Sequence, residues 1–224
     1  YTTANTLSLH DALPISVHIL LDGSGSMGYE DKFGYACRLA AGFAYLAVLE
    51  NEKYAISLFC RKFYPGEPKR GRINLIRSVE ELDGVAPRGA TSLRAVADQL
   101  EASLKSTSLV VLISDLLADT EEVLSSIYRL SGHELVVIQV LAPAETELSF
   151  GGDIKFVDLE SGQPLITRIT EGERREYLRR LGEHNDRIRE ACSQVGAEYF
   201  LFRTDQPVFE SFTEMLGRTI IQKA

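Results

Sequence analysis

Two short apolar runs that each end in an aspartate constrain the fold of this chain more than any other feature. The first, Val17–Leu21, ends at Asp22 and a Gly/Ser cluster, and the second, Leu109–Ser114, ends at Asp115. A short apolar run bounded by turn-forming residues indicates a buried strand. Segments with apolar residues at helical spacing separate these runs from other strand-like segments. Such alternation predicts parallel strands joined by crossover helices.

We therefore predict an α/β fold with a doubly wound, mostly parallel sheet and helices on both faces. The length of 224 residues suits one domain, or one domain with an insertion. Two strand-like segments around the turn Glu160–Gly162 interrupt the α/β pattern and predict an inserted β-hairpin near 153–169. The expected strands are Val17–Leu21, Tyr54–Phe59 with Arg61–Tyr64 paired to it, Leu109–Ser114, Leu135–Leu141, Asp153–Leu159, Pro164–Ile169 and Glu198–Phe202, and the expected helices are Asp31–Glu50, Ile73–Leu82, Leu93–Leu104, Thr120–Leu130, Gly172–Val195 and Val208–Ile221.

Oxygen-bearing side chains follow both of these strands and open one further helix. Asp22, Ser24 and Ser26 come directly after the first strand, Thr91 precedes a helix, and Asp115 ends the later strand. Because the carboxyl ends of parallel strands meet at one crevice, we expect these segments to converge. Residues two apart in an extended segment share a side, so the serines and Asp22 can face one ion. Carboxylate and hydroxyl oxygens suit Mg²⁺ or Mn²⁺, and the pattern leaves open which of them bind directly and which through water.

The pattern DxSxS, then a threonine, then an aspartate, resembles the metal-ion-dependent adhesion site of von Willebrand factor A domains. The match lies at Asp22, Ser24, Ser26, Thr91 and Asp115, and the resemblance extends from about Val17 to the C-terminus. It implies a protein interaction module and no enzyme activity. In such a module, an acidic side chain of the partner protein completes the coordination of the metal ion.

A closer resemblance is to a bacterial family still labelled a domain of unknown function (number 58). The segments that carry it are LLDGSGSM, VVLISDLLAD, HELVVIQVLAPAETEL and VDLESGQPL. Members of that family typically accompany MoxR-type AAA+ ATPases. The resemblance therefore implies an adaptor that works with such an ATPase.

The first residues of the chain are treated separately. The segment TLSLHDALPI at Thr6–Ile15 is identical to one reading frame of a widely used sequencing-library adapter. We therefore expect residues 1–15 to be an adapter-derived artefact and 16–224 to form the domain, and we do not count His10 or Asp11 as site residues. The β-rich segment that precedes this domain in the family would then be missing.

The glycines of the first loop also fit a dinucleotide-binding fingerprint. Gly23, Gly25 and Gly28 satisfy G-x-G-x-x-G after a strand and before a helix. However, Asp22 would place negative charge beside a pyrophosphate, and Leu58–Arg61 stands where an acidic residue should hold the ribose. These features disfavour a dinucleotide site.

A Mg²⁺-dependent phosphotransferase or phosphatase remains the alternative function. In it, Asp22 would accept a phosphoryl group beside the ion. Against it, the loop has no second carboxylate two residues after Asp22, and no lysine follows a strand in a suitable position.

Composition limits the partners and the compartment. The formal net charge of −8 disfavours nucleic acid and anionic membranes as partners, and no apolar run approaches the roughly 20 residues that span a bilayer. The three cysteines are distant in sequence and form no CxxC pair, so we expect buried thiols in a reducing, cytoplasmic compartment. We expect His18 and His133 to be structural and His184 to be solvated on a charged helix.

Overall fold

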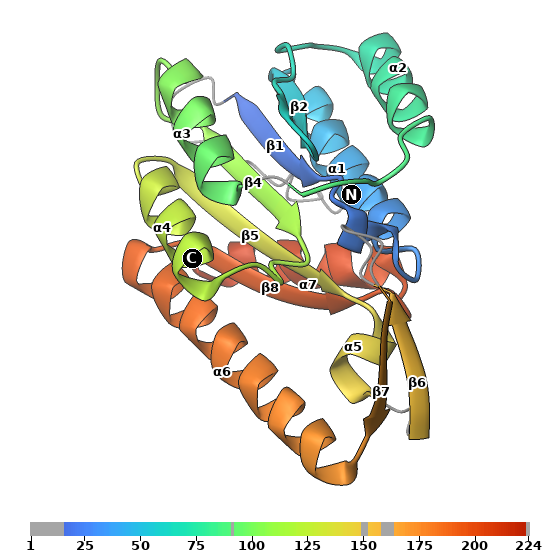
Figure 1. Cartoon of the computed structure of the whole chain (residues 1–224). Helices are drawn as coiled ribbons and strands as arrows, with labels where there is room; N and C mark the ends of the chain where they lie inside the picture. Colours follow the sequence, from blue (N-terminus) through green and yellow to red (C-terminus); the bar gives the residue numbers. More distant parts are fainter. Residues whose placement is uncertain (1–15, 91, 149–151, 158–163, 223–224) are drawn as a thin grey trace, which may run out of the picture.

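A six-stranded sheet in the order β3-β2-β1-β4-β5-β8 forms the centre of the chain (Figure 1). The computed structural model describes residues 16–90, 92–148, 152–157 and 164–222. All pairings in the sheet are parallel except that of β3 with β2 at one edge. The predicted doubly wound, mostly parallel α/β fold is confirmed. Its strands are β1 (Val17–Asp22), β2 (Tyr54–Phe59), β3 (Phe63–Tyr64), β4 (Leu109–Ser114), β5 (Glu134–Leu141) and β8 (Glu198–Arg203).

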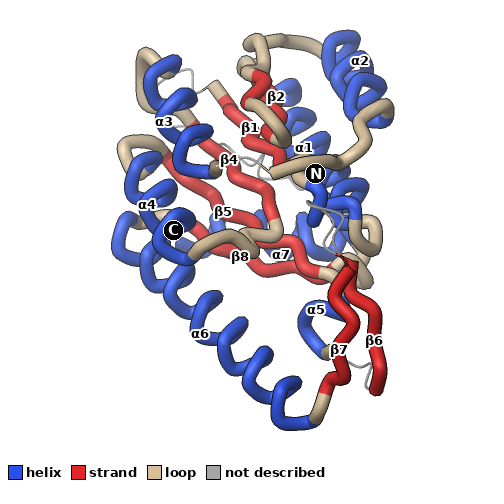
Figure 2. Tube along the Cα trace, in the orientation of Figure 1, coloured by secondary structure: helices blue, strands red, loops and turns tan. Residues whose placement is uncertain are grey.

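Helices cover both faces of this sheet, as Figures 1 and 2 show. One face carries α1 (Lys32–Leu49), α2 (Arg72–Asp83) and α7 (Val208–Gln222), and the other carries α3 (Leu93–Ser103), α4 (Thr120–Leu130) and α6 (Glu171–Val195). Each face has its own apolar core. Successive side chains of a strand point to opposite faces, so the central strands contribute to both cores. In β1, Ile19 and Leu21 pack on the α1 face and Leu20 packs on the other.

The order of the strands places a crevice between β1 and β4. The chain passes from β1 to β2 on one side and later returns to β4 on the other side. The connections that leave β1 and β4 therefore diverge at the carboxyl edge of the sheet, which is where α/β proteins bind ligands. Asp22 and Asp115 lie at this point, because the register pairs Leu21 of β1 with Ile113 of β4.

The predicted hairpin is present as a separate two-stranded sheet. Strands β6 (Gly152–Val157) and β7 (Pro164–Ile169) are antiparallel and lie apart from the main sheet in Figure 2. The expected turn at Glu160–Gly162 lies outside the described residues, as do residues 1–15. Two short elements were not expected, the 3-10 turn η1 (Gly25–Gly28) and the helix α5 (Pro143–Glu147) that leads to the hairpin.

The expectation that the three cysteines are buried thiols is confirmed in part. Cys60 and Cys192 are buried, Cys37 is half-buried, and all three are free thiols. Burial raises the pKa of Cys37 and of Cys192 to about 12, so neither is a reactive thiolate at neutral pH. Among the described residues, no helix has both the length and the apolar character needed to cross a bilayer.

Close packing of α1 on α7 makes Gly42 a sensitive position. A Cβ atom there would lie 2.7 Å from Cε2 of Phe212, whose ring meets Phe43 edge-on at 5.4 Å between centroids. We expect Gly42→Ala to lower the free energy of unfolding by about 1–3 kcal/mol, because overpacking displaces Phe212. The matched control is Gly182→Ala on α6, where a Cβ meets nothing within 4 Å. Gly182→Ala should raise the free energy of unfolding by about 0.5–1 kcal/mol. If urea denaturation gives the same change for both variants, the packing argument is contradicted.

Candidate metal-binding site

Asp22 is buried at the end of β1 and is held from two sides. Its Oδ1 accepts a hydrogen bond from the backbone N–H of Ser24 at 2.8 Å, and its Oδ2 accepts one from the hydroxyl of Ser114 at 2.5 Å. The Ser114 hydroxyl oxygen in turn accepts the N–H of Leu116 at 3.0 Å. The first aspartate of the pattern is thus tied to the end of β4, as the crevice between the two strands requires.

The two serines of the pattern converge, though by a different route from the one expected. The hydroxyl oxygens of Ser24 and Ser26 lie 3.0 Å apart. Ser24 is extended, with φ −62° and ψ 166°, but Ser26 lies in the 3-10 turn η1. The expectation of one extended segment was therefore wrong for Ser26, because the chain tightens into a turn at Gly25. The N–H of Gly25 bonds to the carbonyl of Gly89 at 2.8 Å and so joins the first loop to the one that leads to Thr91.

Asp115 is buried at the end of β4 and is paired with a buried lysine. Its Oδ1 accepts the N–H of Leu117 at 3.1 Å, and its Oδ2 lies 2.8 Å from the Nζ of Lys32. Lys32 is fully buried, and its Nζ also lies 2.6 Å from Oε1 of Glu145. The Oε2 of Glu145 accepts the N–H of Ala142 at 2.8 Å. One ammonium group thus links the candidate site to α5.

Neither Lys32 nor Glu145 was identified from the sequence. The signal for Lys32 is its position on the apolar stripe of α1, because Ala36 and Leu39, four and seven residues further on, are fully buried. A lysine on such a stripe needs a buried partner. Glu145 lies in a short helix that the sequence did not predict, so no sequence signal led to it.

The candidate residues surround one cavity of about 380 Å³ at the carboxyl edge of the sheet. Asp22, Ser24, Ser26 and Asp115 all line it. Thr91 lies outside the described residues, while Ala90 and Ser92 on either side of it line the same cavity. Glu122 of α4 adds a third carboxylate to the lining, where its Oε1 accepts a 2.6 Å hydrogen bond from the Ser92 hydroxyl. Sequence reasoning did not single out this glutamate.

The electrostatics of the cavity favour a cation. Burial, and then the repulsion of Asp115, raise the pKa of Asp22 to about 6. Burial alone would lower the pKa of Lys32, but the carboxylates of Asp115 and Glu145 outweigh it and raise that pKa. The ammonium group of Lys32 therefore already neutralises the carboxylate of Asp115. Among the described residues, in contrast, the hydrogen-bond donors to the two oxygens of Asp22 are neutral, the N–H of Ser24 and the hydroxyl of Ser114.

The donor set fits Mg²⁺ or Mn²⁺ only if hydroxyl groups take part. Within the described residues, no cluster of three or more His, Cys, Asp or Glu side chains is placed to hold a metal ion. The carboxylates of Asp22, Asp115 and Glu122 and the serine hydroxyls, all oxygen donors, line the cavity instead. Hard divalent ions of this kind keep several water ligands and need few carboxylates, so the residues present fit such an ion.

His184 corrects the expectation of a solvated side chain. Its Nε2 lies 2.8 Å from the carbonyl oxygen of Leu116, and its Nδ1 lies 2.8 Å from the hydroxyl of Thr120. Because a carbonyl can only accept, Nε2 carries the proton and donates it. His184 thus fastens the loop after Asp115 to α6. His18 and His133 are structural as expected, bonded to Ser16 and to Glu101.

The glycines of the first loop do not open a helix in the way a dinucleotide site needs. The turn η1 ends at Gly28, and α1 begins only at Lys32, whose ammonium group is bound to Asp115. The helix start therefore carries a buried ion pair beside the crevice. This arrangement again disfavours a dinucleotide site.

Comparison with known protein families is decisive for the assignment. The model of the family described as "Protein of unknown function DUF58" matches residues 13–187, which is most of the chain. The chain belongs to the DUF58 family. No curated protein matches the sequence of this DUF58 chain.

Solved structures share the fold of this DUF58 chain at low sequence identity. The conserved hypothetical protein BatB from Bacteroides thetaiotaomicron is 17% identical, with a TM-score of 0.57 over 94% of this chain and 100% of that one. An aerotolerance-related membrane protein from Bacteroides fragilis is 17% identical, with a TM-score of 0.54 over 91% of this chain and 99% of that one. The vWF domain of the type V pili tip protein Mfa5 from Porphyromonas gingivalis is 11% identical, with a TM-score of 0.51 over 95% of this chain and 97% of that one. These likenesses confirm a von Willebrand factor A-like fold.

Proposed function

We propose that this chain is a divalent-metal-dependent protein interaction module. A Mg²⁺ or Mn²⁺ ion held at the carboxyl edge of the sheet would bind an acidic side chain of a partner protein. The observation that carries the proposal is the convergence of Asp22, Ser24, Ser26 and Asp115 on one cavity at the β1/β4 crevice.

The residues of the chain would supply two kinds of oxygen donor to the ion. The carboxylates of Asp22 and Asp115 supply negative charge, and the hydroxyls of Ser24, Ser26 and Thr91 supply neutral oxygen donors. When bound, the ion supplies a positive centre that attracts a carboxylate. Because the protein offers few charged ligands, the ion keeps enough net positive charge to bind an anionic group.

The partner proposed from the family resemblance is a MoxR-type AAA+ ATPase, for which the chain would act as an adaptor. The site geometry supports only the chemistry of the contact, an acidic side chain on the ion. A Mg²⁺-dependent phosphotransferase or phosphatase that uses Asp22 is the alternative. Lys32 gives that alternative a buried lysine near the site, but its ammonium group is bound to Asp115 and Glu145.

The test combines metal binding, ligand capture and turnover on the same protein. We expect Mn²⁺ to bind in calorimetry with a dissociation constant in the micromolar to millimolar range. A surface coated with poly-glutamate should retain the protein in Mn²⁺ and release it in chelator. A phosphate ester such as p-nitrophenyl phosphate should not be hydrolysed.

The outcomes separate the two functions. Metal binding with chelator-sensitive capture and no turnover supports the interaction module. Turnover that Asp22→Ala abolishes would establish the phosphotransfer alternative instead. The absence of any metal binding would overturn both functions.

A further inference from the structure

The last turn of α2 has an unusual charge for its position. Glu80, Glu81 and Asp83 lie there, and no basic residue does. The carboxyl end of a helix dipole is itself negative, so acidic side chains at this end work against the stability of the helix. Residues that break such a local rule often serve a function. These carboxylates therefore need a cation, either from the chain itself or from a ligand.

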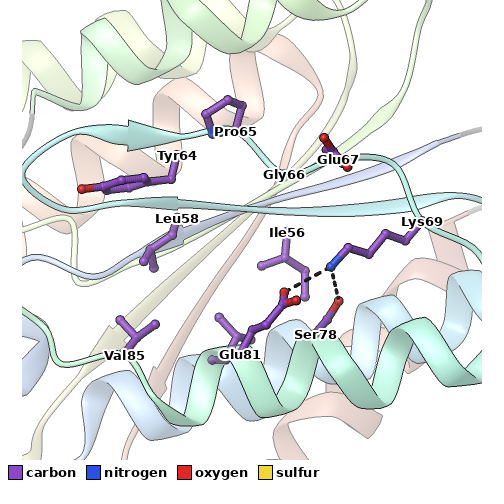
Figure 3. A pocket seen from close by; sticks show the side chains of 11 residues that line it. Ile56, Leu58, Tyr64, Pro65, Gly66, Glu67, Lys69, Ser78, Glu81 and Val85 are labelled. Carbon is purple, nitrogen blue, oxygen red and sulfur yellow. Dashed lines mark hydrogen bonds and ion pairs between the residues drawn. The ribbon is translucent and has the colours of Figure 1, made fainter.

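Glu81 has its cation within the fold. Figure 3 shows Lys69 directed at Ser78 and Glu81, where its Nζ lies 3.3 Å from the serine hydroxyl and 3.1 Å from a carboxylate oxygen of the glutamate. This side of α2 borders a cavity of about 340 Å³ against β2. Glu80 and Asp83 are exposed, and in the described part of the chain neither has an ion-pair partner. Two carboxylates of the turn are therefore available to a ligand.

A groove of about 550 Å³, which we call the α1–α2 groove, separates this end of α2 from α1, and both available carboxylates line it. Most of its other lining residues are apolar, among them Phe33, Cys37 and Ala41 from α1 and Val79 from α2. Val79 is 42% exposed although it is apolar. The α1–α2 groove thus combines an apolar lining with two exposed carboxylates.

The other charged residues of the groove neutralise each other. Nη2 of Arg38 lies 2.8 Å from Oδ2 of Asp31, and Arg38 is the one basic side chain among the described residues that line the groove. Arg72 projects from α2 in nearly the same direction as Asp83, but it begins the helix, about 16 Å further along the axis. Glu80 and Asp83 therefore leave the groove with a net negative charge.

The groove opens beside the candidate metal site. Gly28, two residues after Ser26, lines it, and so does Pro87. A Cβ atom on Gly28 would lie 3.7 Å from Cβ of Pro87. The next residue, Arg88, donates its N–H to the carbonyl of Gly23 at 2.9 Å. The first loop of the metal site therefore forms one end of the groove, so that one bound polypeptide can reach both.

We propose that the α1–α2 groove binds a lysine or arginine side chain of the same partner protein that places a carboxylate on the metal ion. This inference rests on the proposed function. The aliphatic stem of such a side chain packs on the apolar lining, and its charged head pairs with Glu80 and Asp83. The partner segment therefore carries an acidic residue and, a few positions along the chain, a basic one.

A basic polypeptide fits this groove better than other ligands. A second copy of this chain, or a nucleic acid, would bring negative charge towards two unpaired carboxylates. A purely apolar helix would leave these carboxylates without a counter-charge. A bare metal ion would make no use of the apolar lining. The formal net charge of −8 adds a long-range attraction for a basic partner.

The groove is tested in chelator, so that the metal site plays no part. The probe is a fluorescent peptide of alternating leucine and lysine, compared with a leucine–glutamate peptide of the same length, and anisotropy reports binding to the whole chain. We expect the lysine peptide to bind and the glutamate peptide not to bind. Glu80→Gln with Asp83→Asn should weaken binding about tenfold. The matched control, Glu190→Gln with Glu210→Gln, removes the same charge at exposed positions elsewhere and should bind like the wild type.

The apolar lining is tested by filling the groove. Ala41→Leu should weaken binding of the lysine peptide about fivefold, because the larger side chain occupies the space of the lysine stem. The control Ala102→Leu lies at an exposed position of α3 and should have no effect. Absence of binding, equal loss in both charge variants, or no effect of Ala41→Leu would overturn the proposal.

The link to the metal site is tested with one peptide that carries a glutamate and two lysines, separated by a short glycine linker. In Mn²⁺ it should bind about tenfold more tightly than in chelator, because the two contacts act together. Equal binding in both, by a protein that calorimetry shows to hold Mn²⁺, would overturn the shared partner. A protein that holds no Mn²⁺ but still binds the lysine peptide would instead overturn the proposed metal function and leave the groove assignment standing.

Discussion

Replacing Lys32 by methionine is expected to lower the free energy of unfolding by about 3–5 kcal/mol, because it leaves buried carboxylates without their cation. Lys32 is fully buried and lies 2.8 Å from Asp115 and 2.6 Å from Glu145, whose side chains are 5% and 16% exposed. Methionine keeps most of the side-chain volume, so the loss reports the missing charge. Urea denaturation in chelator at pH 7 measures it.

An exposed ion pair gives the matched control. Arg129 and Asp98 lie 2.8 Å apart, and each side chain is 52% exposed. Arg129→Met should cost less than about 1 kcal/mol, because water screens the pair. If Lys32→Met costs no more than this control, Lys32 does not neutralise the carboxylates as we infer. Adding Glu145→Gln to Lys32→Met should recover part of the stability, because it removes one of the unpaired charges.

The same variant probes the link between the metal site and the lysine. With Lys32 gone, a divalent ion becomes the available cation for Asp115. Mn²⁺ should therefore raise the stability of Lys32→Met more than that of the wild type, measured as the shift of the thermal midpoint. An equal shift in both proteins would show that the ion and Lys32 act on different carboxylates.

Much of the fold and of the candidate site followed from the sequence, for identifiable reasons. The strands β1 and β4 are buried along their whole length and are mostly apolar, as a strand covered on both faces requires. Their aspartates mark the carboxyl edge, so the convergence of Asp22 with Asp115 follows from topology alone. The presence of the hairpin strands β6 and β7 was also predictable, because the α/β pattern changes there.

The missed residues share a physical cause, which is that their roles depend on tertiary contacts. Lys32 is recognisable only against the buried face of α1, and Glu145 only once α5 is known to fold back on that lysine. His184 was expected in solvent because its helix is highly charged, yet it meets the loop after β4 at Leu116. Sequence periodicity reports which face of a helix is apolar, but not which distant loop lies against its polar face.

Replacing Asp22 by asparagine is expected to weaken Mn²⁺ binding by about 100-fold, because it removes one of the two buried carboxylates of the site. The amide is nearly isosteric and can still accept the 2.8 Å hydrogen bond from the N–H of Ser24, so the loop should keep its shape. Asp119→Asn is the matched control, since Asp119 caps α4 and asparagine caps helices equally well. Calorimetric titration of the three proteins measures the difference, and equal affinities would remove Asp22 from the site.

The stability of Asp22→Asn should move in the opposite direction to its metal affinity. Burial and the repulsion of Asp115 raise the pKa of Asp22 to about 6, from an ordinary value of 3.8. A raised pKa means that the contribution of this group to stability is present below about pH 4 and is lost as the pH rises through 6. In chelator at pH 7, the variant should therefore be more stable than the wild type by about 1–2 kcal/mol, and the gain should shrink towards pH 4. Mn²⁺ should reverse the order at pH 7, because the ion favours the ionised carboxylate that the asparagine lacks. A variant that is less stable than the wild type in chelator would show that the hydrogen bonds of Asp22 outweigh the strain of its buried charge.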